Sequence, residues 1–425
     1  MSPATLAGTA RLPVVVAVAL SAFLAQALLH YTLPLFFEAK GMARVSWETW
    51  SYYEIIAWLF GPPLAGLLAG RLGERVAWSL GMAGYALVGG LVFVLPSSGA
   101  AADSALGAAA FCYGVASALI WVGGISLAQN VPDRQKGLSN ALIMTSLGAG
   151  SIAGPLIGRW LVGLSAAGQS PQSPHFYPSL AVYSLFSVMG AVLILGFGQH
   201  GGTSTSPRRD SRSSWRQSLA LLKDGRYLTL IITLSLLGGP VFQATNVYRP
   251  YRARDPEIGL IVGAQDHGWA ALEVTNYVMQ LLGGILIGLL AGKKAALWMA
   301  ALMLAAFSAC GAAIGAAPSA IPLFAFSAVF ELIRQFMRWV QTGYVSEYVS
   351  ERQRPSAIGL SVTCSGLGSW AFNLLTRNLQ SPNEPGFSSS LPFYIAACIG
   401  LTGALVLFVA SRWRNGNRLE PPAAP

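Results

Sequence analysis

The sequence carries too little charge for a soluble protein of its length. Only 10% of its 425 residues are Asp, Glu, Lys or Arg, whereas 54% are hydrophobic. A soluble domain carries about 25% charged residues, because its surface must be hydrated. A water-soluble body of this size is therefore excluded, and most apolar side chains must face lipid or one another.

Motifs for catalysis and cofactor binding are also missing. No G-x-x-x-x-G-K-[ST] loop occurs, so we expect no ATP-driven step within this chain. The four cysteines have neither the spacing of a metal site nor that of a disulfide framework, and buried free thiols are expected. With no clustered catalytic groups, the sequence predicts no cofactor, no bound metal and no enzymatic activity.

Long apolar runs take the place of a soluble domain. A helix needs about 20 residues to cross a hydrocarbon core of roughly 30 Å, and only helices or closed barrels satisfy their backbone there. The first run is too long for a signal peptide, so we interpret it as a retained span. We expect an all-α integral membrane protein with twelve transmembrane helices, at 12–36, 47–70, 76–96, 105–130, 137–163, 178–198, 227–249, 268–291, 295–316, 320–346, 355–378 and 390–411.

Basic residues predict the orientation of these spans. The net charge is +10, and two thirds of the 27 Lys and Arg residues fall on one side if the N-terminus is cytoplasmic. This asymmetry follows the positive-inside rule and places both termini in the cytoplasm. The basic excess is thus explained by topology rather than by a nucleic-acid partner. We expect a multi-pass protein of the plasma membrane, or of the inner membrane if the cell is Gram-negative.

Two short sequences occur twice in the same order. GLLAG stands at 66–70 and again at 288–292, each time followed by a cation, while RQK at 134–136 precedes span 5 and RQR at 352–354 precedes span 11. The matches predict duplication of a six-span unit, whose two copies share one orientation because six is even. The expected parts are an N-terminal six-helix bundle (1–198), a polar cytoplasmic linker (199–226) and a C-terminal six-helix bundle with a short tail (227–425).

The run GLLAGRLGER at 66–75 resembles a signature of the major facilitator superfamily, G-x-L-A-D-R-x-G-R-R. The matching positions are Gly66, Leu68, Ala69, Arg71, Gly73 and Arg75. Gly70 stands in place of the usual Asp, and Glu74 replaces the first of the paired basic residues. The resemblance implies a parallel repeat of two six-helix bundles. It also implies that the family's latch between the halves, in which the Asp takes part, is lost here or uses Glu74.

Span 5 contains GSIAGPLIG, which resembles the G-x-x-x-G-P-x-x-G signature of the superfamily's antiporter branches. Its fixed positions are Gly150, Gly154, Pro155 and Gly158. Glycines four apart let helix backbones approach closely, and a proline removes a backbone donor and bends the helix. The run marks either a flexing seam between the bundles or simple close packing.

Span 10 carries a polar face within its apolar sequence. Glu331, Arg334, Gln335 and Arg338 recur at intervals of three and four. A charged side chain in a bilayer costs about 2.5–3.5 kcal/mol on insertion scales, so each needs a reason. In one interpretation Glu331 binds a proton or a cationic group, and Arg334 or Arg338 binds a carboxylate, phosphate or sugar oxygen. In the other, Glu331 and Arg334 neutralise one another and Arg338 reaches the cytoplasmic interface.

Spans 1 and 7 offer further polar candidates. Gln26 and His30 share a face of span 1. Because a histidine side chain titrates near neutral pH, His30 could take part in proton coupling, and a structural role near the membrane interface is an equal alternative. In span 7, Gln243 and Asn246 suit hydrogen bonds to a polar ligand. The resemblance implies that spans 1 and 7 line the central cavity.

Two acids lie toward the outer ends of spans 2 and 8. They are Glu54 and Glu273, and Glu273 shares a face with Asn276, Tyr277 and Gln280. Either they protonate during transport, or they pair across the extracellular gate, for example with Arg249 or Arg377.

These features predict a secondary active transporter that moves a small organic solute by alternating access, coupled to protons. The span 5 signature favours export by antiport. The arginines of span 10 favour uptake or exchange of an anionic or polyhydroxylated metabolite. A rival of another class is a membrane receptor or scaffold that binds without transport. The expected partners are the solute, protons and the lipid bilayer, with the chain as a monomer.

Overall fold

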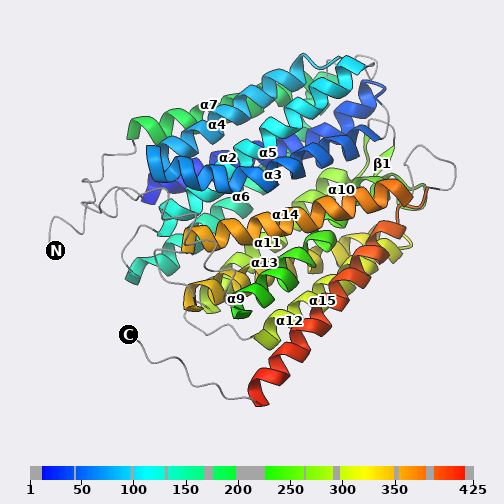
Figure 1. Cartoon of the computed structure of the whole chain (residues 1–425). Helices are drawn as coiled ribbons and strands as arrows, with labels where there is room; N and C mark the ends of the chain where they lie inside the picture. The colour runs from blue at the N-terminus through cyan, green and yellow to red at the C-terminus, as the bar shows by residue number, and fades with distance from the viewer. Residues whose placement is uncertain are drawn as a thin grey trace.

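The computed structural model is a bundle of long helices that lie side by side (Figure 1). It describes residues 12–42, 45–96, 100–129, 133–166, 176–197, 225–262, 265–290, 297–348, 354–379 and 387–416. The first half comprises α2 (Leu12–Ala39), α3 (Val45–Leu72), α4 (Glu74–Phe93), α5 (Ala100–Gln129), α6 (Asp133–Ala166) and α7 (Tyr177–Phe197). The second comprises α9 (Gly225–Leu230), η2 (Ile231–Leu236), α10 (Gly239–Arg254), β1 (Ile261–Val262), β2 (Gln265–Asp266), α11 (Trp269–Leu290), α12 (Leu297–Ala316), α13 (Ala320–Tyr348), α14 (Arg354–Leu379) and α15 (Leu391–Gly416).

Every predicted span coincides with helix to within a few residues at each end, which confirms the all-α membrane fold. Within the described residues, seven helices are long and apolar enough to cross a membrane on length and composition alone. Others, such as α3 and α14, carry more polar residues and pack along these helices. Nearly all of the predicted linker, from 199 to 224, lies outside the described residues.

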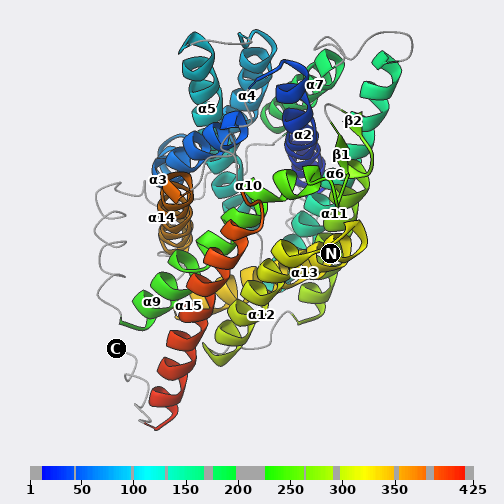
Figure 2. The same ribbon diagram turned by 90° about the vertical axis from the view of Figure 1, so that its right-hand side faces the viewer.

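The two halves meet along two helix pairs. Helix α3 packs against α14 on one flank, and α6 packs against α11 on the other (Figure 2). Within the first half, α2 contacts α6 and α7, and in the second, α12 contacts α13 and α15. The remaining contacts between the halves are sparse, so these two pairs and the ends of the helices determine how the halves meet.

At the end that carries β1 and β2, polar contacts join the halves. The hydroxyl of Tyr31 on α2 donates to Asp266 Oδ2 on β2 at 2.8 Å. Arg254 Nη2 donates to the carbonyl of Pro34 at 2.9 Å, and Trp47 Nε1 on α3 donates to the carbonyl of Val247 on α10 at 3.1 Å. The structure is therefore closed at this end, which we call the hairpin end.

Span 7 is interrupted, whereas the sequence predicted one continuous helix at 227–249. The segment η2 has the wide turns of a π-helix, and a turn at residues 237 and 238 separates it from α10. Pro240 lacks an N–H donor, so it cannot continue the hydrogen-bond ladder. A Cβ added at Gly368 of α14 would lie 1.9 Å from the carbonyl oxygen of Leu236, so α14 also presses on this segment.

The two glycine signatures have separate structural explanations. Gly73 adopts φ 91° between α3 and α4, a left-handed conformation that favours glycine. Gly150, Gly154 and Gly158 of α6 face α2, where added Cβ atoms would lie 2.6, 2.6 and 2.5 Å from Leu20, Leu28 and Tyr31. These glycines therefore pack within the first half, which favours close packing over a flexing seam between the bundles as the explanation of their spacing. It is Gly148 that faces the second half, against Leu281 of α11.

Replacing Gly154 by Ala tests this packing. The new methyl group would meet the backbone nitrogen of Leu28 at 2.6 Å, so we expect a loss of about 1–3 kcal/mol from the free energy of unfolding. Gly90→Ala is the matched control, because Gly90 is exposed in α4 with no atom within 4 Å. There alanine should be neutral or stabilise by up to about 1 kcal/mol. Thermal unfolding in detergent measures both, and equal melting temperatures for the two variants would contradict the packing.

Candidate functional site

Glu331 lies at the centre of a buried polar cluster formed by α10, α11 and α13. Its side chain is 1% exposed. Arg249 Nη1 of α10 donates to Glu331 Oε1 at 3.2 Å, and Gln280 Nε2 of α11 donates to Oε2 at 2.9 Å. Arg334 Nη1, one turn along α13, donates to the same Oε2 at 2.9 Å. Donors from three helices thus converge on one carboxylate.

Arg249 bridges two acids on different helices. Its second terminal nitrogen lies 3.0 Å from Glu273 Oε1 on α11, in an ion pair that the sequence had offered as one possibility. All three side chains are at most 9% exposed. With Arg334, two arginines balance two glutamates, which is the condition for keeping charges away from water. We refer to Arg249, Glu273, Glu331 and Arg334 as the charge network.

Arg334 also contacts an aromatic ring. Its guanidinium carbon lies 4.3 Å from the ring centroid of Phe242 on α10, a cation–π geometry. His30 of α2 lies within electrostatic reach of both Arg249 and Arg334. The charge network of the second half therefore faces α2 of the first half.

Polar atoms beside the charge network have unused hydrogen-bonding capacity. Asn276 is 0% exposed, and neither its Oδ1 nor its Nδ2 has a hydrogen-bond partner in the described part of the chain. The same holds for Nε2 of Gln335, which is 1% exposed. A buried polar group without a partner is costly, so these atoms are natural contacts for a ligand or for water.

The first half presents aromatic and hydroxyl groups. His30 Nε2 lies 2.7 Å from the hydroxyl of Tyr113 on α5. The Tyr113 ring stacks on that of Tyr85 at 5.1 Å, and the Tyr85 hydroxyl shares a hydrogen bond with Ser117 at 2.8 Å. The interior of this half thus offers hydrogen bonds and ring faces, whereas the second half offers charges.

The remaining predicted site residues lie outside the charge network. Gln26 and Asn246 are half-buried and Gln243 is buried. Glu54 is half-buried and lies near the indole rings of Trp50 and Trp58 in the first half, without an arginine partner among the described residues.

Some predictions fall outside what the structure describes. The structure does not describe the side chains of Arg338 in α13 and Arg71 in α3, or the surroundings of Gly70, so the predictions for these residues are not addressed. Gly66 is exposed in α3 and Arg75 is half-buried in α4. The state of the expected latch around Gly70 and Glu74 therefore stays a prediction.

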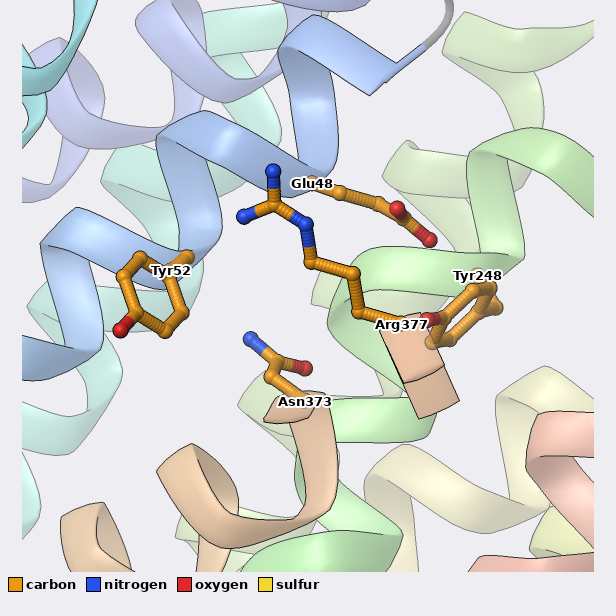
Figure 3. Close-up of a pocket in the computed structure, with 5 residues that line it drawn as sticks. All are labelled: Glu48, Tyr52, Tyr248, Asn373 and Arg377. Carbon is orange, nitrogen blue, oxygen red and sulfur yellow. The ribbon is translucent and has the colours of Figure 1, made fainter. Parts of the chain in front are cut away.

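Sequence reasoning missed Glu48 and left Arg249 as a mere candidate partner. Glu48 lies in the first turn of α3, where acidic residues are common because they complement the helix dipole. That position carried no functional signal. In the structure Glu48 is 6% exposed and lines a small pocket with Tyr52, Tyr248, Asn373 and Arg377 (Figure 3).

A sequence model of the major facilitator superfamily matches residues 15–372. The chain belongs to the major facilitator superfamily. A search of curated proteins finds no match. As a member of this family the protein is a secondary transporter with a small-molecule substrate, set in a membrane.

Solved structures of other transporters share the fold. A POT family transporter in complex with a thioalcohol-conjugated peptide gives a TM-score of 0.73 at 11% identity, covering 95% of this chain and 96% of that one. The nucleoside transporter NupG gives 0.68 at 16% identity, covering 94% and 98%. The fucose:proton symporter FucP of E. coli gives 0.66 at 15% identity, covering 95% and 98%. At these identities the likeness concerns the fold alone.

Removing the Arg249 charge should destabilise the protein strongly. Arg249→Gln leaves Glu273 without its ion-pair partner and weakens the hold on Glu331, and breaking a buried pair costs about 3–5 kcal/mol. Arg377→Gln is the control, since Arg377 is exposed near the end of α14. Thermal unfolding in detergent should show a large loss for the first variant and little for the second.

A double-mutant cycle separates the ion pair from other effects. Adding Glu273→Gln to Arg249→Gln restores charge balance, so the double variant should be more stable than the sum of the single losses predicts. Strict additivity of the two losses would contradict a direct interaction between Arg249 and Glu273.

Proposed function

We propose that this protein is a proton-coupled transporter of a small organic solute that carries an anionic or polyhydroxylated group. One observation carries the proposal: a single buried carboxylate, Glu331, accepts hydrogen bonds from Arg249, Arg334 and Gln280 on three helices. The arginines that suit a substrate oxygen are thus the same groups that bind the Glu331 carboxylate.

Substrate and proton binding are linked through this competition. A carboxylate, phosphate or hydroxyl oxygen of the solute replaces a Glu331 oxygen at Arg334, because the guanidinium has a limited number of donors. The released Glu331 carboxylate then lies in a dry site without its full set of partners, and it takes up a proton. Solute and proton are bound together, which corresponds to symport. When both leave, Glu331 pairs again with Arg334 and the empty carrier can return.

The pre-formed surroundings support a ligand of mixed polarity. Asn276 and Gln335 supply unused amide groups beside the charge network, and His30 and Tyr113 supply hydrogen-bonding and ring surfaces across the interface. Transporters of similar fold include a nucleoside transporter and a fucose:proton symporter, and nucleosides and fucose are polyhydroxylated. These names support the class of solute without specifying it.

A second candidate is export by proton antiport, in which a cationic group of the solute competes with the proton for Glu331. The α6 signature around Gly154 and Pro155 favours it, through its resemblance to the antiporter branches. Since the glycines of that signature pack on α2, their spacing is also explained without any role in transport direction.

We also propose the orientation, the location and the oligomeric state. The hairpin end faces outward, and α2 begins and α15 ends at the cytoplasmic side of the plasma membrane. The support is the distribution of Lys and Arg in the sequence. The division into bundles at 1–198 and 227–425, joined by a linker, and the monomeric state belong to the same proposal.

Proton movement in proteoliposomes with an enclosed pH-sensitive dye tests the proposed function. Pools of anionic, polyhydroxylated and cationic solutes are added to the wild type, Glu331→Gln and Arg334→Gln. We expect an anionic or polyhydroxylated pool to move protons inward with the wild type, and both variants to lose this coupled flux by at least about tenfold. The control is Glu257→Gln, an exposed acid outside the charge network, which should behave as wild type.

Other outcomes decide between the candidates. Outward proton-driven movement of a cationic pool that survives Arg334→Gln but not Glu331→Gln would support antiport and exclude the symport proposal. Solute equilibration without proton movement would contradict coupling. Solute binding without any flux would support the receptor alternative.

A further inference from the structure

The pocket at Glu48 lies in the seam between the halves, apart from the charge network. Glu48 and Tyr52 come from α3 of the first half, Tyr248 from α10, and Asn373 and Arg377 from α14 of the second half (Figure 3). It is small and shares no residue with the charge network. Because α3 and α14 form one of the two main contacts between the halves, relative movement of the halves must open or reshape this pocket.

The carboxylate of Glu48 is buried here without hydrogen-bond donors. Glu48 is 6% exposed, and neither Oε1 nor Oε2 has a hydrogen-bond partner among the described residues. The hydroxyl of Tyr248 lies on the same side of the pocket, but it donates to Thr376 Oγ1 at 2.9 Å. Asn373 is 7% exposed, and its Oδ1 also lacks a partner. The pocket therefore holds three buried oxygen acceptors that have no hydrogen-bond partner among the described residues.

Among the charged groups around the pocket, Arg377 lies within electrostatic reach of Glu48 but is exposed, and the others have partners elsewhere or face solvent. Arg377 is exposed, and its guanidinium carbon lies 5.9 Å from the ring centroid of Tyr52. Glu38 of α2 pairs with Arg254 at 3.7 Å, and Lys40, just after α2, donates from Nζ to the carbonyl of Leu95 at 2.6 Å. On α5, the acid nearest the hairpin end is Asp103, which is exposed. None of these groups gives Glu48 the buried counter-charge that Glu331 has in Arg249 and Arg334.

We propose that Glu48 is a second proton-binding site, protonated while the hairpin end is closed and deprotonated when α3 separates from α10 and α14. This inference rests on the proton coupling of the proposed function and adds a site to it. A buried carboxylate without donors is costly, whereas the carboxylic acid is neutral and gains an O–H donor for Asn373 Oδ1 or for a water. On opening, water reaches the group, and the proton passes from the carboxylic acid to water as hydronium.

In this proposal, Glu331 and Glu48 have different roles in proton coupling. Glu331 responds to the solute, because its partners are the arginines that a solute oxygen would take. Glu48 responds to the conformation, because its surroundings change from dry to wet when the seam opens. A protonated Glu48 favours closure of the hairpin end, and its loss of a proton favours opening, so the closed state should be favoured at low pH even without solute.

Distances between spin labels at the hairpin end test this site. Val94→Cys, after α4, and Leu379→Cys, at the end of α14, place labels on exposed positions of opposite halves, in a chain whose four native cysteines are serine. The protein is studied in lipid nanodiscs without solute. We expect the label distance to lengthen as the pH is raised from acidic to alkaline, because the hairpin end opens.

Variants of Glu48 should remove this response. Glu48→Gln is isosteric with the protonated acid and should keep the short distance at every pH, and Glu48→Leu, neutral and of similar size, should do the same. Glu48→Asp should retain a pH-dependent shift. Asp103→Asn is the control and should keep the wild-type response, whereas Arg377→Gln, at the other charged residue of the pocket, tests whether an ion pair with Glu48 carries the response. Elution as a single species on size-exclusion chromatography checks that each variant is folded.

Three results would overturn the proposal. They are a label distance that is independent of pH in the wild type, a wild-type pH response in Glu48→Gln, and loss of the response in Arg377→Gln, which would assign it to an ion pair. The outcome is separate from that of the dye experiment. If the wild type shows proton-driven flux but Glu48→Gln keeps the wild-type pH response of the label distance, only the Glu48 site is contradicted. If the label distance shifts with pH in a Glu48-dependent way but no proton-driven flux occurs, only the proposed function is contradicted.

Discussion

The guanidinium of Arg249 is the interaction on which the interior of the second half depends. It pairs with Glu273 of α11 and with Glu331 of α13, so one buried side chain connects three helices. The second arginine, Arg334, completes the charge balance. In a low-dielectric interior, loss of any one charge leaves another uncompensated. In the proposed function, this same requirement makes the cluster sensitive to a proton or to an anionic solute, since either changes the charge balance.

The halves contribute unlike chemistry to the space between them. The second half brings charges and unused amides, while the first brings the imidazole of His30, which lies within electrostatic reach of Arg249 and Arg334. Contacts at the hairpin end, such as Tyr31 with Asp266, hold this interface closed on one side. Because the halves meet mainly through α3–α14 and α6–α11, rocking about these pairs can open one end as the other closes.

Glu331 and Glu48 illustrate how two acids in one protein take different parts. Glu331 has donors from three helices, whereas neither oxygen of Glu48 has a hydrogen-bond partner in the described part of the chain. In the proposed mechanism, the environment of Glu331 changes when a solute binds, and that of Glu48 changes when the helices separate. Coupling of this proposed kind would link solute binding to conformation through proton occupancy, with no need for a direct contact between the two sites.

The sequence by itself determined the twelve spans and the polar face of α13, because span length and helical periodicity are local properties. It also placed Glu331 and Arg334 within contact distance, since they are one turn apart. Only the tertiary structure showed that Arg249 reaches both Glu273 and Glu331, because that depends on how three helices are rotated against one another. Packing likewise turned the glycines of α6 toward α2. It also buried Glu48, a first-turn acid of the kind that usually stays at a hydrated helix end.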